Sequence, residues 1–277
     1  MPILHAIVLG LVQGLSEFLP ISSSGHLVLV PWLFEWTELS ANPDLNRTFD
    51  VALHLGTFAG AVAYFRTDIV LYAGAALRSL RHRAVRSQDE RVAWLLIVST
   101  LPAAVVGALL ESLVEDQLSA EWVVGVMLVV FALVLRWADG LPGRHGEDRF
   151  RLRHALVMGA AQAAALQPGV SRSGATISAA RWLGFTRAAA TRLSFLMSLP
   201  VIGGAGLYQG VEVVAEGGLP PGLGPPFAWG MAASAISGFL AVWALLRLVR
   251  NHSFQPFVIY RIVVGTAVVA IAASPWR

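Results

Sequence analysis

The chain contains no cysteine and no lysine, and it has few charged residues of any kind. The absence of cysteine excludes a disulfide framework and any metal site built on thiolates. Charged residues make up only 13% of the 277 residues, whereas soluble domains carry roughly 25%. Hydrophobic residues make up 56%, so the composition predicts an integral membrane protein. The basic residues form no nucleic-acid-binding motif, and we expect no nucleic-acid partner.

Six apolar segments approach the length of about 20 residues that a helix needs to cross the hydrocarbon core of a bilayer. The predicted fold is therefore an all-α integral membrane protein with about six transmembrane helices, formed by one domain over residues 1–277. The segments are 49–65, 92–110, 122–137, 193–211, 227–246 and 256–274.

Two other apolar regions, residues 3–35 and 154–185, are interrupted at their centres by serine, glycine and proline. Irregular backbone at membrane depth is tolerated only where protein or a water-filled cavity satisfies its polar groups. Each region contains two apolar stretches of about half the spanning length, which favours a re-entrant helical hairpin over an ordinary polar loop. The two tips run from Ser16 to His26 and from Gln167 to Gly174.

Arginines in the loops predict the orientation, because cytoplasmic loops of membrane proteins carry an excess of basic residues. Sixteen arginines fall on one set of alternate loops, and only one falls on the other set. This bias puts the arginine-rich loops in the cytoplasm and both termini outside. The arginine-rich loops are 66–91, 136–153, 181–192 and 247–255, and the arginine-poor loops are 36–48, 111–121 and 212–226.

A weak internal repeat relates the two hairpins at an offset of 149 residues. Three predicted spans follow each hairpin, and because three is odd, the second copy must enter the membrane inverted. Inverted repeats whose broken helices meet near the midplane are a known membrane architecture. We therefore expect pseudo-repeats 1–140 and 150–277 whose hairpin tips meet at one buried site. The aligned pairs are Gly10 and Gly159, Gln13 and Gln162, Ser22 and Ser171, Ser24 and Ser173, and Gly25 and Gly174.

An ionisable residue inside a membrane segment is costly and is a functional candidate by default. Arg172, in the second tip, has a planar guanidinium group that matches two phosphate oxygens at once. Helices expected to begin near Ser24 and Ser173 would add backbone N–H groups, which bind anions at helix N-termini. These groups suit a diphosphate, and a purely structural pair of Arg172 with Glu17 is the alternative. The predicted substrate-binding residues are Gln13, Ser22, Ser24, Ser171, Ser173 and Thr176.

Glu17 and His26 are the titratable candidates of the first tip. A carboxylate beside a phosphate works through a metal such as Mg²⁺ or acts as a general base. His26 follows three serines, and a nucleophilic hydroxyl needs a base within reach. The alternatives are a Glu17 that only caps the hairpin and a His26 that is bonded within the first turn of the next helix.

Other polar residues are expected to have structural roles. His54 is predicted to be a packing or partner-bonded residue. Arg261 lies five residues into the last predicted span, and we expect its side chain to extend to the nearby interface. Arg181 lies just beyond the second hairpin tip, and its replacement by lysine is expected to be nearly silent.

At these tips the sequence resembles the undecaprenyl-diphosphate phosphatase family of bacteria, the bacitracin-resistance type. The first signature of that family, (E/Q)xxxE followed by a serine-rich turn and Gly-His, is present from Gln13 to His26. The second, PGxSRSxxT, is present from Pro168 to Thr176. Because the first position is Gln13 rather than glutamate, this residue cannot serve as an essential base.

The resemblance implies an enzyme that removes the terminal phosphate of a C55 polyprenyl diphosphate and so regenerates the carrier lipid of peptidoglycan synthesis. It implies a divalent cation, Mg²⁺ or Ca²⁺, held by Glu17. It also implies a multi-pass protein of the bacterial cytoplasmic (inner) membrane whose active site faces outward. A second copy of the chain, in a homodimer, is the one protein partner that we consider.

The mechanism that we expect begins with attack of Ser23 on the terminal phosphorus, with Glu17 or His26 as the proton acceptor. Arg172, Ser173 and Thr176 would hold the phosphate oxygens. Direct attack by metal-activated water or by His26 is the alternative to a serine nucleophile.

Two rival functions fit parts of the sequence. A transporter or flippase for polyprenyl-phosphate lipids is one, because inverted repeats are typical of secondary transporters. A phosphatase of the phosphatidic-acid type is the other, but Ser178 stands where that type requires a histidine. Release of phosphate by the purified protein would exclude the transporter.

Overall fold

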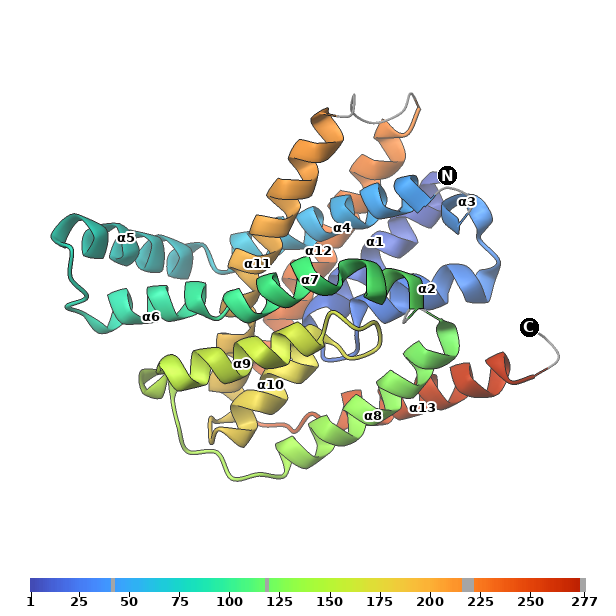
Figure 1. Cartoon of the computed structure of the whole chain (residues 1–277). Coiled ribbons are helices and arrows are strands. Elements are labelled where there is room, and N and C mark those ends of the chain that lie inside the picture. Colours follow the sequence, from blue (N-terminus) through green and yellow to red (C-terminus); the bar gives the residue numbers. More distant parts are fainter. Residues whose placement is uncertain (41–42, 118–119, 216–221, 275–277) are drawn as a thin grey trace.

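The chain folds into helices joined by short loops (Figure 1). The computed structural model describes residues 1–40, 43–117, 120–215 and 222–274, and in this part of the chain no β-strand forms. The helices are α1 Ile3–Phe18, α2 Ser23–Phe34, α3 Thr37–Ser40, α4 Pro43–Tyr64, α5 Arg66–His82, α6 Gln88–Val98, α7 Leu101–Gln117, α8 Glu121–Asp139, α9 Leu152–Ala164, α10 Arg172–Trp182, α11 Arg187–Ala215, α12 Gly224–Leu248 and α13 Gln255–Ala272, with a short 3-10 turn at Glu147–Arg149.

Five helical stretches in the described residues are long and apolar enough to cross a membrane, and they coincide with five of the six predicted spans. The remaining predicted span, 49–65, forms most of α4, a helix of 22 residues. Polar residues such as Arg47, Asp50 and His54 lower the mean hydropathy of α4, so it is not among the five. The five are Gln88–Leu109, Glu121–Asp139, Arg187–Val211, Gly224–Leu248 and Gln255–Ala272.

The predicted span 92–110 contains a break between α6 and α7. Pro102 has no N–H group to continue the hydrogen-bonding pattern of α6. Side-chain hydroxyls satisfy carbonyls near the break: Ser99 donates to the oxygen of Leu96 at 2.7 Å, and Thr100 to that of Ile97 at 2.7 Å. A kink of this kind is tolerated inside a membrane because side chains satisfy the freed backbone groups.

Both predicted hairpins are present, as α1–α2 and α9–α10. Figure 1 shows the two turns side by side in the middle of the molecule, and hydrogen bonds between them confirm that they meet. The hairpins thus bring residues about 150 positions apart in the chain into one place.

Helix α12 lies between α1 and α4 and sets their spacing. A Cβ atom added at Gly14 of α1 would collide with Ser237 of α12, and one at Gly60 of α4 would collide with Ala235. Small residues that let backbones approach closely are typical of helix packing in membranes. This packing fixes the positions of α1 and α4, which carry Glu17 and His54.

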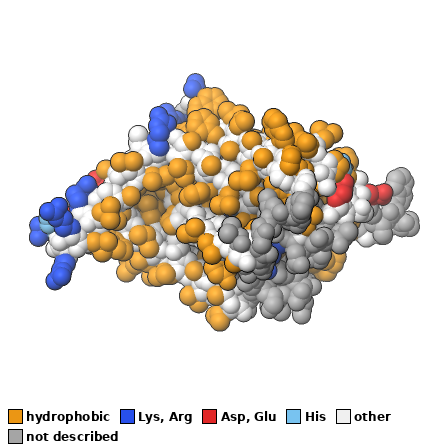
Figure 2. Space-filling view, turned by 90° about the horizontal axis from the view of Figure 1, so that it is seen from above, with side chains coloured by type: hydrophobic (Ala, Val, Ile, Leu, Met, Phe, Trp, Pro, Cys, Tyr) orange, Lys and Arg blue, Asp and Glu red, His pale blue; other side chains and the backbone are white. Residues whose placement is uncertain are grey.

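Hydrophobic side chains cover much of the face drawn in Figure 2, and arginines gather at the end where α5 and α6 are joined. The exposed apolar residues include Val70, Leu109, Ile236 and Val263. A continuous apolar surface would be unfavourable in water, whereas lipid tails cover it in a bilayer. The surface therefore agrees with the membrane location that the composition predicts.

Candidate active site

The two hairpin tips have the same backbone geometry. Ser22 and Ser171, which precede α2 and α10, have φ angles of 75° and 73°, in the left-handed region that costs energy for residues other than glycine. Each serine caps its helix by accepting a hydrogen bond from the N–H of the residue three positions later, at 3.4 Å from Gly25 and 3.1 Å from Gly174. The helices begin at Ser23 and Arg172, one residue earlier than predicted.

Serine side chains also join one tip to the other. The hydroxyl oxygen of Ser22 accepts a hydrogen bond from the N–H of Gly169 at 3.1 Å. In the opposite direction, the hydroxyl of Ser173 donates to the carbonyl of Leu19 at 3.1 Å. Two serines predicted to bind substrate therefore hold the tips together.

Arg261 of α13 is wholly buried and binds the backbone of both tips. Its guanidinium group donates to the carbonyls of Pro20 at 3.2 Å, Gly169 at 2.8 Å and Val170 at 3.0 Å, and to that of Leu128 at 3.2 Å. The prediction that Arg261 extends to the interface is therefore wrong. A buried guanidinium group needs acceptors for its N–H groups, and the turns of the two tips supply carbonyls that no helix uses.

Glu17, at the end of α1, is the centre of the polar cluster. One carboxylate oxygen forms an ion pair with Arg172. The other accepts hydrogen bonds from the hydroxyl of Ser23 at 2.6 Å and from the amide of Gln13 at 3.0 Å. The Nε2 atom of His54 lies 3.6 Å from the same oxygen. The structure thus unites candidates from both tips around one nearly buried carboxylate.

His26 does not contact Ser23 through either ring nitrogen. Its Nδ1 atom lies 2.6 Å from the carbonyl oxygen of Ser22, and its Nε2 atom lies 2.7 Å from the hydroxyl of Tyr260. The rings of His26 and Tyr260 also stack, with centroids 5.6 Å apart. Of the two predicted proton acceptors, only Glu17 is hydrogen-bonded to Ser23 in this conformation.

Thr176 lies on α10, one turn after Arg172. It is fully buried, donates to the carbonyl of Arg172 at 2.8 Å, and is 2.6 Å from the hydroxyl of Ser194. Ser24 remains beside the site, partly buried, with its hydroxyl 3.5 Å from that of Ser22. The side chains that surround Ser23 most directly are therefore those of Glu17 and its partners.

Sequence reasoning missed two residues of this cluster. His54 is an ionisable residue within a predicted span, and that placement alone marks a functional candidate. Tyr260 carried no comparable signal, because a tyrosine in the last span is equally expected at a membrane interface. Their contacts depend on how α4 and α13 pack against the first tip.

The residues present fit a hard divalent cation that takes some of its ligands from the protein and the others from a phosphate group or water. No group of three or more His, Cys, Asp or Glu side chains suited to a metal occurs within the described residues. Two oxygen donors lie together in the site, however: the carboxylate of Glu17 and the Oε1 atom of Gln13, which is buried without a hydrogen-bond partner. Mg²⁺ and Ca²⁺ prefer such oxygens, and phosphate oxygens or water complete their coordination.

The chain matches a family model described as "Bacitracin resistance protein BacA" over residues 6–267, a range that contains both tips. It belongs to the BacA family. Curated relatives of this BacA-family chain are named undecaprenyl-diphosphatase. The protein of Geobacter sulfurreducens is 48% identical over 272 residues, which cover 98% of each chain. That of Pelobacter propionicus is 46% identical over 276 residues, 98% of this chain and 97% of its own.

Proposed function

We propose that this protein hydrolyses undecaprenyl diphosphate to undecaprenyl phosphate and inorganic phosphate. The observation that carries the proposal is the hydrogen bond of 2.6 Å from the Ser23 hydroxyl to Glu17, whose other oxygen pairs with Arg172. A hydroxyl held by a carboxylate beside an arginine has the parts that phosphoryl transfer needs: nucleophile, base and anion binder. The names of the relatives agree with this chemistry.

In the reaction that we propose, the Ser23 oxygen forms a bond to the terminal phosphorus and its proton passes to Glu17. The anhydride P–O bond breaks, and the leaving lipid monophosphate takes the proton from Glu17. Water then attacks the phosphoserine and gives a proton to Glu17, which returns it to the Ser23 oxygen as inorganic phosphate leaves. Glu17 and Ser23 are thereby restored.

Arg172 changes partner in this scheme. Without substrate, its pairing with Glu17 balances two charges that would otherwise be buried alone. An arriving diphosphate offers Arg172 two oxygens in one plane, which its guanidinium group can bind together. Glu17 is then free to accept the proton of Ser23. The N–H groups at the starts of α2 and α10 add donors for the phosphate oxygens.

Glu17 and the Oε1 atom of Gln13 would hold a divalent cation, Mg²⁺ or Ca²⁺, together with the substrate. When bound, such an ion neutralises charge on the diphosphate and stabilises the leaving phosphate. The remaining steps are carried out by Ser23, Glu17 and Arg172.

We also propose the arrangement in the cell: the bacterial cytoplasmic (inner) membrane, with both termini and the active site facing outward. The arginine bias of the loops supports this orientation.

The matching φ angles of Ser22 and Ser171 support the proposal that 1–140 and 150–277 are inverted pseudo-repeats. A homodimer stays a prediction, which cross-linking in membranes would test.

Phosphate release by the purified protein with undecaprenyl diphosphate and Mg²⁺ tests the function. Ser23→Ala should lower turnover by about a hundredfold or more, because the attacking atom is lost, while substrate binding stays nearly intact. The matched control is Ser274→Ala at the end of the chain, which should behave as the parent. Turnover of Ser23→Ala within a few-fold of the parent would assign the attack to water or His26. Lipid movement without phosphate release would support the transporter instead.

A further inference from the structure

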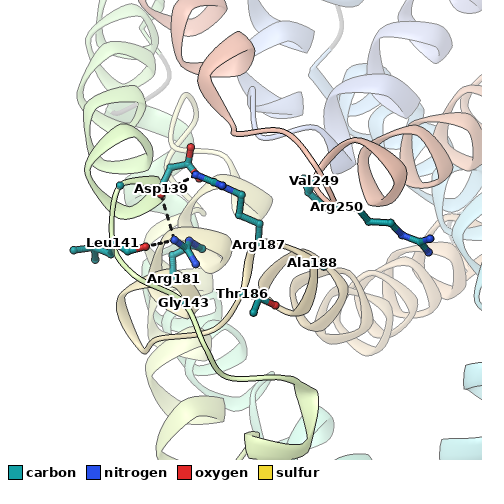
Figure 3. A pocket seen from close by; sticks show the side chains of 10 residues that line it. Asp139, Leu141, Gly143, Arg181, Thr186, Arg187, Ala188, Val249 and Arg250 are labelled. Atoms are coloured by element: carbon teal, nitrogen blue, oxygen red, sulfur yellow. Dashed lines mark hydrogen bonds and ion pairs between the residues drawn. The ribbon is translucent and has the colours of Figure 1, made fainter.

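A second polar site lies at the other end of α10, away from the hairpin tip. There a hollow of about 450 Å³ opens among the ends of α8, α10, α11 and α12 (Figure 3). Arg172 and Arg181 stand near opposite ends of α10, and nine residues at the helical rise separate them by about 14 Å. The hollow is therefore separate from the proposed active site.

Positive charge dominates the lining of the hollow. Three arginines line it, Arg181, Arg187 and Arg250, against one carboxylate, Asp139. Both oxygens of Asp139 are already engaged, one by Arg187 and the other by the N–H of Phe254 at 3.1 Å. The single carboxylate is paired with Arg187, so the lining of the hollow keeps a net positive charge.

Two of the arginines retain donors without acceptors. Arg181 is buried, and although its terminal nitrogens bind backbone carbonyls, including that of Phe185 at 2.6 Å, its Nε atom has no hydrogen-bond partner. Arg250 extends from the rim in Figure 3, exposed, and forms no hydrogen bond or ion pair with the described residues. Its long side chain is free to turn over the hollow when an anion enters.

The first turn of α11 adds further donors. The hydroxyl of Thr186 caps this helix of 29 residues by accepting from the N–H of Ala189 at 3.2 Å. The N–H groups of Arg187 and Ala188 belong to residues that line the hollow and, as first-turn groups, have no partner within the helix. They bring the positive end of the helix dipole to the same place.

We propose that this hollow binds a phosphate group, and that its main source is the headgroup of an anionic phospholipid. Exposed tryptophans support the lipid source. Trp137 and Trp182 lie next to the hollow in the sequence of α8 and α10, and tryptophan is enriched at the headgroup level of a bilayer. The hollow would thus hold one phospholipid of the leaflet that surrounds it. Free inorganic phosphate has the same binding chemistry and is the second source.

Two variants test the hollow without removing a bond seen in the structure. Arg250→Gln removes the unpaired cation, and Ala188→Glu places a negative charge at the exposed first turn of α11. The matched control is Arg247→Gln, in the last turn of α12 and three residues before Arg250, because Arg247 stacks over Trp243 at 5.9 Å and does not line the hollow. All three variants should keep the parent phosphatase activity.

Native mass spectrometry would count lipid adducts on protein taken from bilayers of phosphatidylglycerol or of phosphatidylcholine. We expect a phosphatidylglycerol adduct whose apparent affinity falls about tenfold in Arg250→Gln and in Ala188→Glu but not in Arg247→Gln. A second arm titrates inorganic phosphate at constant ionic strength and follows thermal unfolding. The other outcome is that inorganic phosphate raises the unfolding temperature of the parent and of Arg247→Gln but not that of Arg250→Gln or Ala188→Glu. That result, with unchanged lipid adducts, would identify free phosphate as the source. If neither ligand distinguishes the two variants from the parent, the proposal is wrong.

Discussion

At the scale of single residues, the mechanism that we propose gives Glu17 a structural and a chemical role at once. Its carboxylate is nearly buried and pairs with Arg172, so removal of either charge would leave the other buried without a partner. The same carboxylate accepts the hydrogen bond of Ser23. The sequence offered a structural ion pair and a phosphate site as alternatives, and the geometry is compatible with both, in different states of one enzyme.

Substitution of Arg172 separates charge from shape. Arg172→Lys keeps a positive charge beside Glu17 but loses the planar pair of donors that grips two phosphate oxygens. We expect kcat/KM to fall by about a hundredfold or more, with the protein still folded and inserted. Steady-state phosphate release and a thermal unfolding curve, measured on the same preparation, would check both expectations.

The control for that experiment must be chosen from the structure. Arg181→Lys, which the sequence favoured as a silent change, is unsuitable because Arg181 is buried and binds the carbonyls of Asp139 and Phe185. Arg153 is exposed on α9, so Arg153→Lys should be silent. An Arg172→Lys enzyme that keeps most of its activity would exclude the two-oxygen grip, and loss of folding would make Arg172 chiefly a partner of Glu17.

At the scale of elements, the sequence predicted the hairpins because their tips combine polar residues with short apolar stretches. It did not predict α5, since residues 66–91 are rich in arginine and were expected to form a loop. Helix α5 is held instead by tertiary contacts, such as the hydrogen bond of 2.7 Å from Trp94 to Ser79. Contacts between distant elements, including those of His54 and Tyr260 with the first tip, have no local sequence pattern that reveals them.

Arg261 shows what such a distant contact does for two elements. It binds carbonyls of Pro20 in the first tip and of Gly169 and Val170 in the second. Arg261→Lys offers one point donor in place of several, so buried carbonyls would be left unsatisfied. We expect unfolding to become easier by about 3 kcal/mol. Thermal unfolding in detergent, together with kcat, would measure the effect on both the fold and the site.

The matched control for Arg261 is Arg136→Lys, because Arg136 is exposed and its side-chain hydrogen bond to Gln255, at 3.1 Å, can be replaced by one to water. It should leave the unfolding temperature unchanged. Should Arg261→Lys unfold like the parent while turnover collapses, Arg261 would be a positioning residue for the tips rather than a structural clamp. An unaffected enzyme in both measurements would show that the tips hold together without it.

At the scale of the whole molecule, composition was sufficient to predict an integral membrane protein, and the length of the apolar segments was sufficient to predict the spans. Five helical stretches match them. The position of the first hairpin relative to α4 required the structure, because α12 holds α1 and α4 at close range through glycines such as Gly14 and Gly60. The orientation across the membrane still depends on the arginine bias of the loops.

The orientation can be tested by cysteine labelling, since the chain contains no cysteine of its own. Gln88 and Asp148 are exposed in arginine-rich segments, and Glu35 is exposed at the end of α2. A cysteine at Glu35 should react with a membrane-impermeant maleimide in intact cells, whereas one at Gln88 or Asp148 should react only after the membrane is opened. His145 is less suitable, because its ring contacts the carbonyl of Leu183 at 3.1 Å. Labelling of Gln88 or Asp148 in intact cells would reverse the orientation and, with it, the outward-facing site. Equal labelling of all three positions would mean that the chain inserts in both orientations.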